Sequence, residues 1–161
     1  MLRHPQRFDE VQAQAEAQGL RVSRRSSWPA AGPAANGEAM QADIWLGDTL
    51  GEMALYYALS DVALLGGSFA PLGGQNLIEA AACGCPVVMG PHTFNFLEAA
   101  ERAEVEGAAL RVADMGEAVR CAIALVNEPR ARAKVADSGL EFAARNRGAT
   151  ERTLAALRGY W

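Results

Sequence analysis

Short apolar runs alternate with segments whose apolar residues recur at helical spacing along this 161-residue chain. The apolar runs predict strands at 20–22, 44–46, 62–65, 87–89 and 109–112. Helical spacing predicts helices at 6–18, 51–59, 76–83, 95–105, 115–126, 130–145 and 150–157. Alternation of this kind is typical of an α/β domain in which helices flank a parallel sheet.

Glycines and polar residues follow two successive predicted strands. One strand leads into the run 66–68, Gly-Gly-Ser, and the next leads into the run 90–96, Gly-Pro-His-Thr-Phe-Asn-Phe. Glycine allows backbone to approach a ligand closely, and a helix that opens at Asn76 offers free amides to an anion. We infer from these turns that the chain binds a phosphorylated ligand.

Composition narrows the class of partner. The net charge of -4 and the pI of 5.2 disfavour non-specific binding to nucleic acid, which needs clustered Lys and Arg. The three cysteines lack the spacing of a zinc site or a redox dithiol, so we expect a reduced, cytosolic compartment. Residues 1–5 are not a signal peptide, and no apolar run approaches the roughly 18 residues of a membrane span. Any membrane contact is then peripheral or belongs to a segment outside this chain.

The organisation of the chain predicts one domain over 1–161, with a mobile surface loop at 26–41 that is rich in Ser, Pro, Ala and Gly. Arg3-His4-Pro5 is typical of the turn after a strand, yet only Met1 and Leu2 precede it. The first strand of a doubly wound sheet is central, so its truncation leaves two unpaired strand edges. We therefore expect the chain to be a fragment.

Five motifs in one order resemble the C-terminal half of the 3-deoxy-manno-octulosonate (Kdo) transferases, through about the first two-thirds of the chain. The Gly-Pro-His-Thr-Phe-Asn-Phe run is the most specific of them. The motifs are Arg3-His4-Pro5-x-Arg7-Phe8, Gly47-Asp48-Thr49-Leu50-Gly51-Glu52-Met53, Gly66-Gly67-Ser68, Gly73-Gly74-Gln75-Asn76-x-x-Glu79 and Gly90-Pro91-His92-Thr93-Phe94-Asn95-Phe96.

The resemblance implies a GT-B glycosyltransferase with two Rossmann-like domains, of which the C-terminal one holds the CMP-Kdo donor. The absent N-terminal domain is expected to hold the lipid A precursor and the carboxylate that acts as general base, so this chain alone is expected to be inactive. The resemblance also implies a role in lipopolysaccharide inner-core synthesis at the cytoplasmic face of the bacterial inner membrane. No metal or organic cofactor is implied.

The resemblance assigns donor contacts at loop positions. The residues are Arg3, His4, Thr49, Gly51, Gly67, Ser68, Gly74, Gln75, Asn76, Glu79, His92, Phe94 and Asn95. Two positions depart from the family pattern: Gln75 stands where His is frequent, and Ala80 where Pro commonly follows the Glu. Gln75 donates and accepts hydrogen bonds but cannot carry a positive charge, so weaker donor affinity is expected.

Several of these residues also have structural interpretations. Asn76 and Glu79 have the spacing of a helix cap, as do Thr49 with Glu52 and Asn95 with Glu98. For Glu79 the resemblance favours acceptance of hydrogen bonds from the ribose hydroxyls, and for Glu52 and Glu98 we favour structure.

The remaining candidates carry alternatives of the same kind. Arg3 and His4 are either a frayed terminus or the cationic clamp on the donor. Ser68 offers a hydroxyl and an amide to an anion, and Phe94 or Phe96 either stacks on cytosine or packs the turn.

Two other functions fit the same turns. One is a UDP-sugar site of another GT-B transferase or of an epimerase, which a preference for UDP over CMP would reveal. The other is a non-catalytic sensor of a nucleotide or phosphoanion, which predicts a complete stand-alone fold.

Overall fold

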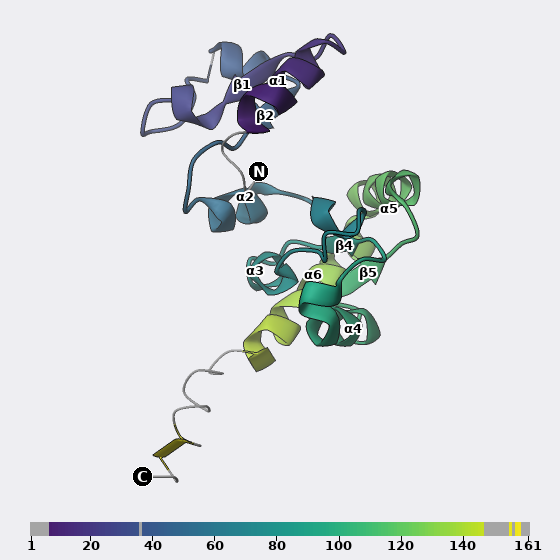
Figure 1. The fold of residues 1–161 in the computed structure, drawn as a ribbon. Helices are drawn as coiled ribbons and strands as arrows, with labels where there is room; N and C mark the ends of the chain where they lie inside the picture. Colours follow the sequence, from purple (N-terminus) through teal and green to yellow (C-terminus); the bar gives the residue numbers. More distant parts are fainter. Residues whose placement is uncertain (1–6, 36, 147–154, 156, 159–161) are drawn as a thin grey trace. The chain divides into compact units, whose positions relative to one another are not determined.

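Figure 1 shows the computed structural model, which describes residues 7–35, 37–146, 155, 157 and 158. The chain divides into two compact units, one ending at Met53 and one beginning at Ala54. Each unit has its own parallel sheet.

The first unit is a small two-stranded sheet with one helix. Strand β1 pairs in parallel with β2, and the helix α1 packs on β1, burying Phe8 and Ala15. The guanidinium of Arg21 donates to both carboxylate oxygens of Asp43 at 3.2 and 3.1 Å, which ties the starts of the two strands together. The elements are α1 Phe8–Glu16, β1 Val22–Arg24, the 3-10 helices η2 Arg25–Ser27 and η3 Glu38–Gln41, and β2 Ile44–Leu46.

The second unit is a three-stranded parallel sheet covered by helices, with strand order β3-β4-β5. Its elements are α2 Met53–Leu59, which starts at the last residue of the first unit, β3 Ala63–Leu64, η4 Gly66–Ser68, α3 Leu77–Ala82, β4 Val87–Met89, η5 Phe94–Phe96, α4 Leu97–Val105, β5 Ala109–Arg111, α5 Met115–Asn127 and α6 Pro129–Asn146.

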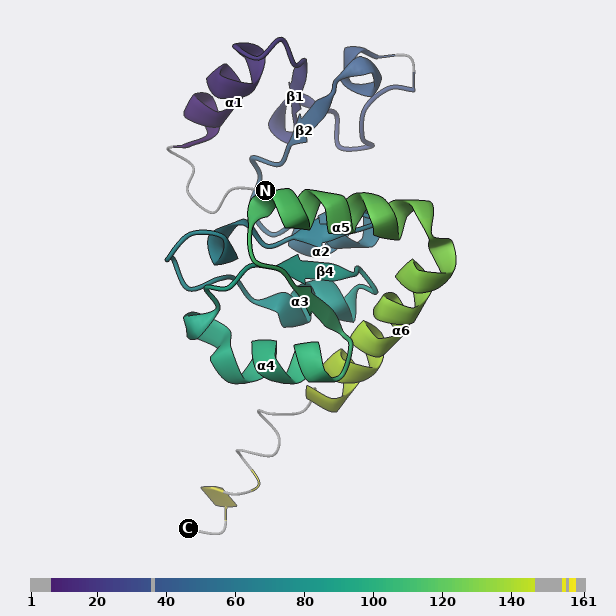
Figure 2. The same ribbon diagram turned by 90° about the vertical axis from the view of Figure 1, so that its right-hand side faces the viewer.

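The core of the second unit lies on both faces of β4. The side chain of Val88 joins a cluster with Ala118 and Leu125 of α5, while Val87 and Met89 point to the opposite face. Figure 2 shows α5 on one side of this sheet and α3 and α4 on the other. All three residues of β4 are completely buried, which is why the strand reads as an uninterrupted apolar run.

Helix α6 packs closely on α3 through small residues. Gly139 faces Ala81, and Phe142 on the same helix is completely buried. No described helix is both long enough and apolar enough to cross a membrane.

The predicted α/β class is confirmed, with parallel strands and flanking helices. The strands fall into two sheets, however, and not into one.

The observed bounds of some strands and helices differ from the predicted ones because polar contacts determine where these elements begin and end. The strand predicted at 20–22 lies instead at Val22–Arg24, because Leu20 is exposed and Arg21 is bound to Asp43. The helix predicted from Asn95 begins at Leu97, after the 3-10 turn η5. The segment 26–41 contains η2 and η3, and its mobility stays a prediction. The helix predicted at 150–157 lies almost entirely outside the described residues.

Replacing Gly139 by alanine is expected to raise the free energy of unfolding by about 0.5–1 kcal/mol, because glycine weakens a helix interior by that amount. The added Cβ would meet the Cα and Cβ of Ala81 at 3.6 Å, which is ordinary contact. Gly139→Leu fills more space than this interface has and is expected to lower the free energy by about 1–3 kcal/mol. Urea unfolding followed by circular dichroism measures both; a destabilised alanine variant would contradict the packing.

Stability in acid is expected to depend on Asp43, whose pKa is lowered to about 2 by the hydrogen bond from the Arg21 side chain and then by the Arg21 amide. An unfolded Asp has a pKa of about 3.9, so this contribution is present above that pH and is lost as the pH falls towards 2. The gap in urea midpoint between the parent chain and Asp43→Asn should therefore shrink between pH 5 and pH 2. Arg21→Gln removes the partner of Asp43, so the difference in urea midpoint between the parent chain and this variant should shrink over the same pH range. A difference that stays constant with pH would argue against this pairing.

Candidate functional site

Two turns at the carboxyl edge of the β3-β4-β5 sheet are held together around Ser68. The Ser68 hydroxyl donates to the carbonyl of Leu65 at 2.6 Å and accepts from the amide of Gly90 at 2.7 Å. The Ser68 carbonyl accepts from the amide of His92 at 3.0 Å. Because the carboxyl edge is where open α/β sheets bind ligands, these contacts set the floor of the candidate site.

A second set of contacts joins the same turns further along. Asn95 donates its amide to the carbonyl of Gly73 at 3.0 Å and its side chain to the carbonyl of Leu72 at 3.1 Å. Gly73 has φ +86°, and a Cβ there would lie 2.3 Å from the Asn95 side-chain nitrogen. Glycine at 73 is thus required both by its backbone conformation and by the close approach of Asn95.

Ser68 corrects one prediction. Its side chain is completely buried, its amide donates to Leu65, and its hydroxyl is used twice within the protein. The serine therefore stabilises the turn and presents neither group to an anion, contrary to the expectation from sequence.

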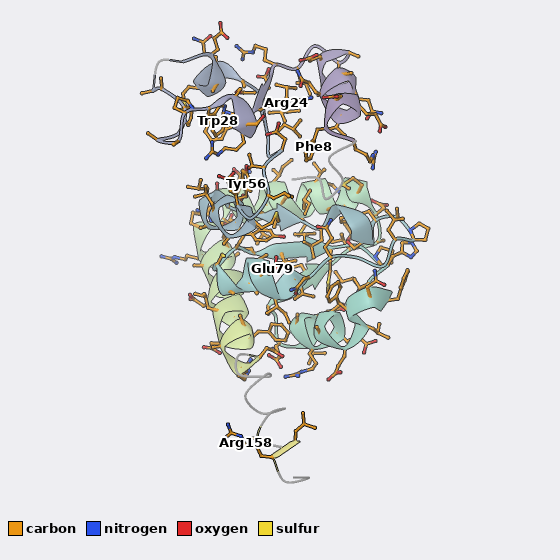
Figure 3. All side chains as sticks on the ribbon, turned by 60° about the vertical axis from the view of Figure 1, so that its left-hand side comes forward. Phe8, Arg24, Trp28, Tyr56, Glu79 and Arg158 are labelled. Atoms are coloured by element: carbon orange, nitrogen blue, oxygen red, sulfur yellow. The ribbon has the colours of Figure 1, made fainter. Side chains whose placement is uncertain are left out.

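Asn76 caps helix α3 as predicted. Its side-chain oxygen accepts from the amide of Ile78 at 3.0 Å, and its side-chain nitrogen lies 3.4 Å from a carboxylate oxygen of Glu79. Glu79, labelled in Figure 3, is exposed on α3. The cap occupies one oxygen of the Glu79 carboxylate only, so the second oxygen is able to accept from a ligand. Contact of Glu79 with a ribose stays a prediction.

The other predicted residues of the second unit differ in exposure. Gly67, Gly74, Gln75 and His92 are half-buried, while Phe94 and Asn95 are exposed. Of the two phenylalanines in this turn, Phe94 has 60% of its surface exposed, whereas Phe96 is half-buried. Gly74 donates its amide to the carbonyl of Gly67 at 3.1 Å, so the first turn closes on itself.

The cap predicted for Asn95 and Glu98 is wrong. Helix α4 has Phe96 at its N-cap position and no side-chain cap. The backbone amide and the side-chain amide of Asn95 instead donate to Gly73 and Leu72 in the preceding turn. These two contacts constrain the position of Asn95 more strongly than a local cap would.

Arg111 supports the second turn and was not foreseen. One guanidinium nitrogen donates to the carbonyl of Gly90 at 3.2 Å and to the hydroxyl of Thr93 at 3.1 Å, while another donates to Glu104 at 2.6 Å. The sequence did contain a signal for this role, namely an arginine inside the apolar run 109–112. A charge in a buried strand is costly unless it is paired, so this arginine indicates polar partners nearby.

In the first unit, Thr49 and Gly51 follow the carboxyl end of β2. The Thr49 hydroxyl donates to the carboxylate of Glu52, which also accepts from Arg25 at 2.9 Å. Gly51 is exposed with φ +80°. Arg25, which comes directly after β1, lies 5.7 Å from the Trp28 ring centre and was not among the predicted site residues. Arg3 and His4 lie outside the described residues.

Asp48 fixes the turn before Thr49. Its carboxylate accepts from the amide of Ser26 at 2.8 Å and from the Ser26 hydroxyl at 2.6 Å. Burial raises the pKa of Asp48, but these hydrogen bonds, the backbone amide of Asp48 and the charge of Arg24 together lower it by more, so the net shift is downward and the side chain stays charged. Among the described residues no group of His, Cys, Asp and Glu is arranged to hold a metal ion.

Parallel strands, flanking helices and glycine turns at the carboxyl ends of β3 and β4 are features of the doubly wound α/β class, whose members bind ligands at that edge. Comparison with known proteins narrows the class. A curated 3-deoxy-D-manno-octulosonic acid transferase of Bordetella pertussis is 53% identical over 156 residues, or 96% of this chain and 35% of that protein. Another, of Haemophilus influenzae, is 37% identical over 160 residues, or 98% of this chain and 36% of that protein.

A solved structure agrees. The C-terminal CMP-Kdo binding domain of WaaA from Acinetobacter baumannii matches with a TM-score of 0.77 and 33% identity, over 87% of this chain and 69% of that chain. No protein-family model matches. The chain therefore belongs to the 3-deoxy-D-manno-octulosonic acid (Kdo) transferase family, and its fold is that of a GT-B C-terminal domain. It spans about a third of the length of the curated relatives it matches.

Ser68→Ala is expected to lower the free energy of unfolding by about 1–3 kcal/mol, because the buried amide of Gly90 loses its acceptor. Ser60→Ala is the matched control: its exposed hydroxyl donates to the Tyr56 carbonyl, and its loss should stay within about 0.5 kcal/mol. Urea unfolding compares the two variants. Equal small effects would show that the two turns hold together without the serine.

Proposed function

We propose that this chain binds CMP-Kdo as the donor domain of a transferase that moves Kdo onto a lipid A precursor. The observation that carries the proposal is its likeness to a domain whose name states that it binds CMP-Kdo. The curated relatives are named for transfer of the same sugar acid. Both comparisons extend over most of this chain.

The arrangement at the carboxyl edge of the second unit supports a nucleotide site. Glycine turns bring backbone to the surface, and the exposed carboxylate of Glu79 lies beside Asn76 at the start of α3. A carboxylate accepts hydrogen bonds only, and the two hydroxyls of a ribose are donors, so we assign Glu79 to the ribose. The exposed ring of Phe94 is the aromatic surface available to the cytosine.

Gln75 and His92 complete the polar rim of the proposed site. Both are half-buried and follow the carboxyl ends of β3 and β4. Because Gln75 is neutral, the charge that opposes the donor phosphate and carboxylate must come from other residues. Arg3 and His4 stay the predicted cationic contacts, with Thr49 and Gly51 as further predicted contacts.

In this proposal the chain binds the donor and the remainder of the transferase performs the proton transfer. We assign the acceptor site and the general base to the rest of the transferase, because this chain spans only about a third of the length of the curated relatives. We also propose that the whole enzyme works at the cytoplasmic face of the inner membrane, where a lipid acceptor and a soluble nucleotide donor meet. Lipopolysaccharide inner-core synthesis is then its role.

Titration of the chain with CMP, followed by ligand-observed NMR, tests the donor site without a labile sugar. CMP is expected to bind, and Glu79→Ala is expected to weaken binding about tenfold or more, the loss for hydrogen bonds to a charged group. Glu101→Ala, an exposed carboxylate further along α4, is the matched control and should bind as the parent chain does.

UMP serves as the competitor in the same experiment. Weaker competition by UMP supports a cytidine nucleotide, whereas a preference for UMP would point to a UDP-sugar donor. Loss of CMP binding in both carboxylate variants would contradict the ribose role of Glu79, because the control removes the same charge elsewhere.

A further inference from the structure

Arg111 is the last residue of β5, and its side chain reaches the turn that follows the neighbouring strand β4. Only 22% of this side chain is exposed. Glu104 of α4 accepts from one guanidinium nitrogen at 2.6 Å, and another guanidinium nitrogen donates to the Gly90 carbonyl and to the Thr93 hydroxyl. Because Glu104 already balances the charge, we assign this guanidinium to the turn and not to a donor phosphate.

The turn after β4 is anchored at its start without Arg111. The amide of Gly90 donates to the Ser68 hydroxyl at 2.7 Å, and the amide of His92 donates to the Ser68 carbonyl at 3.0 Å. The stretch that follows, 93–94, lies beyond these two contacts. Arg111 holds this stretch from the side of β5, so its loss should loosen 93–94 while the start of the turn stays in place.

Thr93 connects the Arg111 contact to Phe94. Thr93 stands at the N-cap position of η5 and is 5% exposed, yet its side chain makes no cap there; its hydroxyl accepts from Arg111 instead. The ring of Phe94 lies so close to Gly73 that a Cβ on that glycine would be 2.6 Å from a ring carbon. Because 60% of Phe94 is exposed, the core does not fix the ring. Its position therefore depends on the backbone that Thr93 fixes and on the contact with Gly73.

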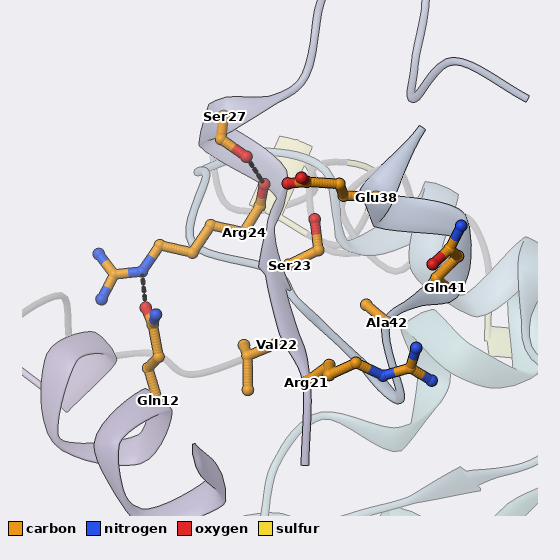
Figure 4. Close-up of a pocket in the computed structure, with 9 residues that line it drawn as sticks. All are labelled: Gln12, Arg21, Val22, Ser23, Arg24, Ser27, Glu38, Gln41 and Ala42. Atoms are coloured by element: carbon orange, nitrogen blue, oxygen red, sulfur yellow. Dashed lines mark hydrogen bonds between the residues drawn. The ribbon is translucent and has the colours of Figure 1, made fainter. Parts of the chain in front are cut away.

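Arg24 of β1 is an arginine with a different structural use. Figure 4 shows its guanidinium donating to Gln12 of α1, at 2.6 Å, and it also pairs with Asp9 of the same helix. These contacts border a hollow of about 510 Å³ and join a strand to a helix. Arg111 differs because two of its contacts are with a turn that carries candidate ligand contacts.

We propose that Arg111 is a positioning residue for recognition of the nucleobase. By holding the turn it sets the ring of Phe94 where a base stacks, and a stacking surface already in place has less to lose in entropy when the nucleotide binds. The inference rests on the proposed function, in which Phe94 faces the cytosine. Ribose recognition by Glu79 does not pass through Arg111, because the Glu79 carboxylate lies beside the cap residue Asn76 in the other turn.

A double-mutant cycle on the whole chain separates positioning from general support. Phe94→Ala is expected to weaken CMP binding about fivefold or more, the usual loss for a base stacked on an aromatic ring. Arg111→Ala should weaken CMP binding about threefold or more in the parent chain, and less than about twofold once residue 94 is alanine. Arg120→Ala removes the same charge from an exposed position of α5 and should bind CMP as the parent chain does.

Hydrogen exchange without ligand tests the same contact independently of CMP. The amide of Phe96 donates to the Thr93 carbonyl at 2.9 Å, and Arg111→Ala should speed its exchange about fivefold or more, while the His92 amide stays protected by Ser68. Thr93→Val removes the hydroxyl contact alone, so it gives the same comparison if Arg111→Ala does not fold.

The outcomes distinguish this inference from the proposed function. If CMP binds the parent chain but the two losses multiply in the double variant, or if the exchange of the Phe96 amide is unchanged, Arg111 does not act through the ring and the inference is overturned alone. If CMP does not bind the parent chain, the proposed function and the inference both fail.

Discussion

The buried hydroxyl of Ser68 is the contact on which the candidate site depends. It joins the turn after β3 to the turn after β4 by accepting from the amide of Gly90, a position that has no room for a side chain because a Cβ would lie 2.5 Å from the Ser68 carbonyl oxygen. Leaving a buried amide without a partner costs about 1–3 kcal/mol, so the two turns are fixed relative to each other. The polar groups on their rim thereby acquire defined positions without any ligand.

The two turns are held in place by the buried core and by a side chain of the neighbouring strand, while their exposed side chains contribute little. The interior is apolar, with Val87, Val88 and Met89 completely buried, and it fixes where the strands end. Arg111 reaches from β5 to the carbonyl of Gly90, so the neighbouring strand also controls the turn. The exposed groups, Glu79 among them, have few contacts with the rest of the protein. A binding site built in this way is rigid in its backbone and leaves its side chains available to a ligand.

Sequence predicts best where burial on two faces produces an uninterrupted apolar run. Strand β4 follows this rule, and its position agrees with prediction. Helix α5 buries only one face, but Asp114 caps its start, and its position agrees with prediction to within a residue. Strand β1 does not, because a salt bridge at Arg21 and a polar edge set its limits. Likewise, spacing identified the cap at Asn76 but not the tertiary contacts of Asn95, because those join residues more than twenty positions apart. Contacts of that range have no local pattern in the sequence.

The glycines of the turn after β3 differ in whether the protein's own structure requires them. At Gly73, both the positive φ and the approach of Asn95 exclude a side chain, so the residue is needed for the shape of the turn. Gly66 has open space around its missing Cβ and an ordinary φ, although it stands in the same motif. A glycine of the second kind is not required by the protein's own packing. The open space beside the Gly66 backbone, at the carboxyl edge of β3, would therefore allow a ligand to approach that backbone closely.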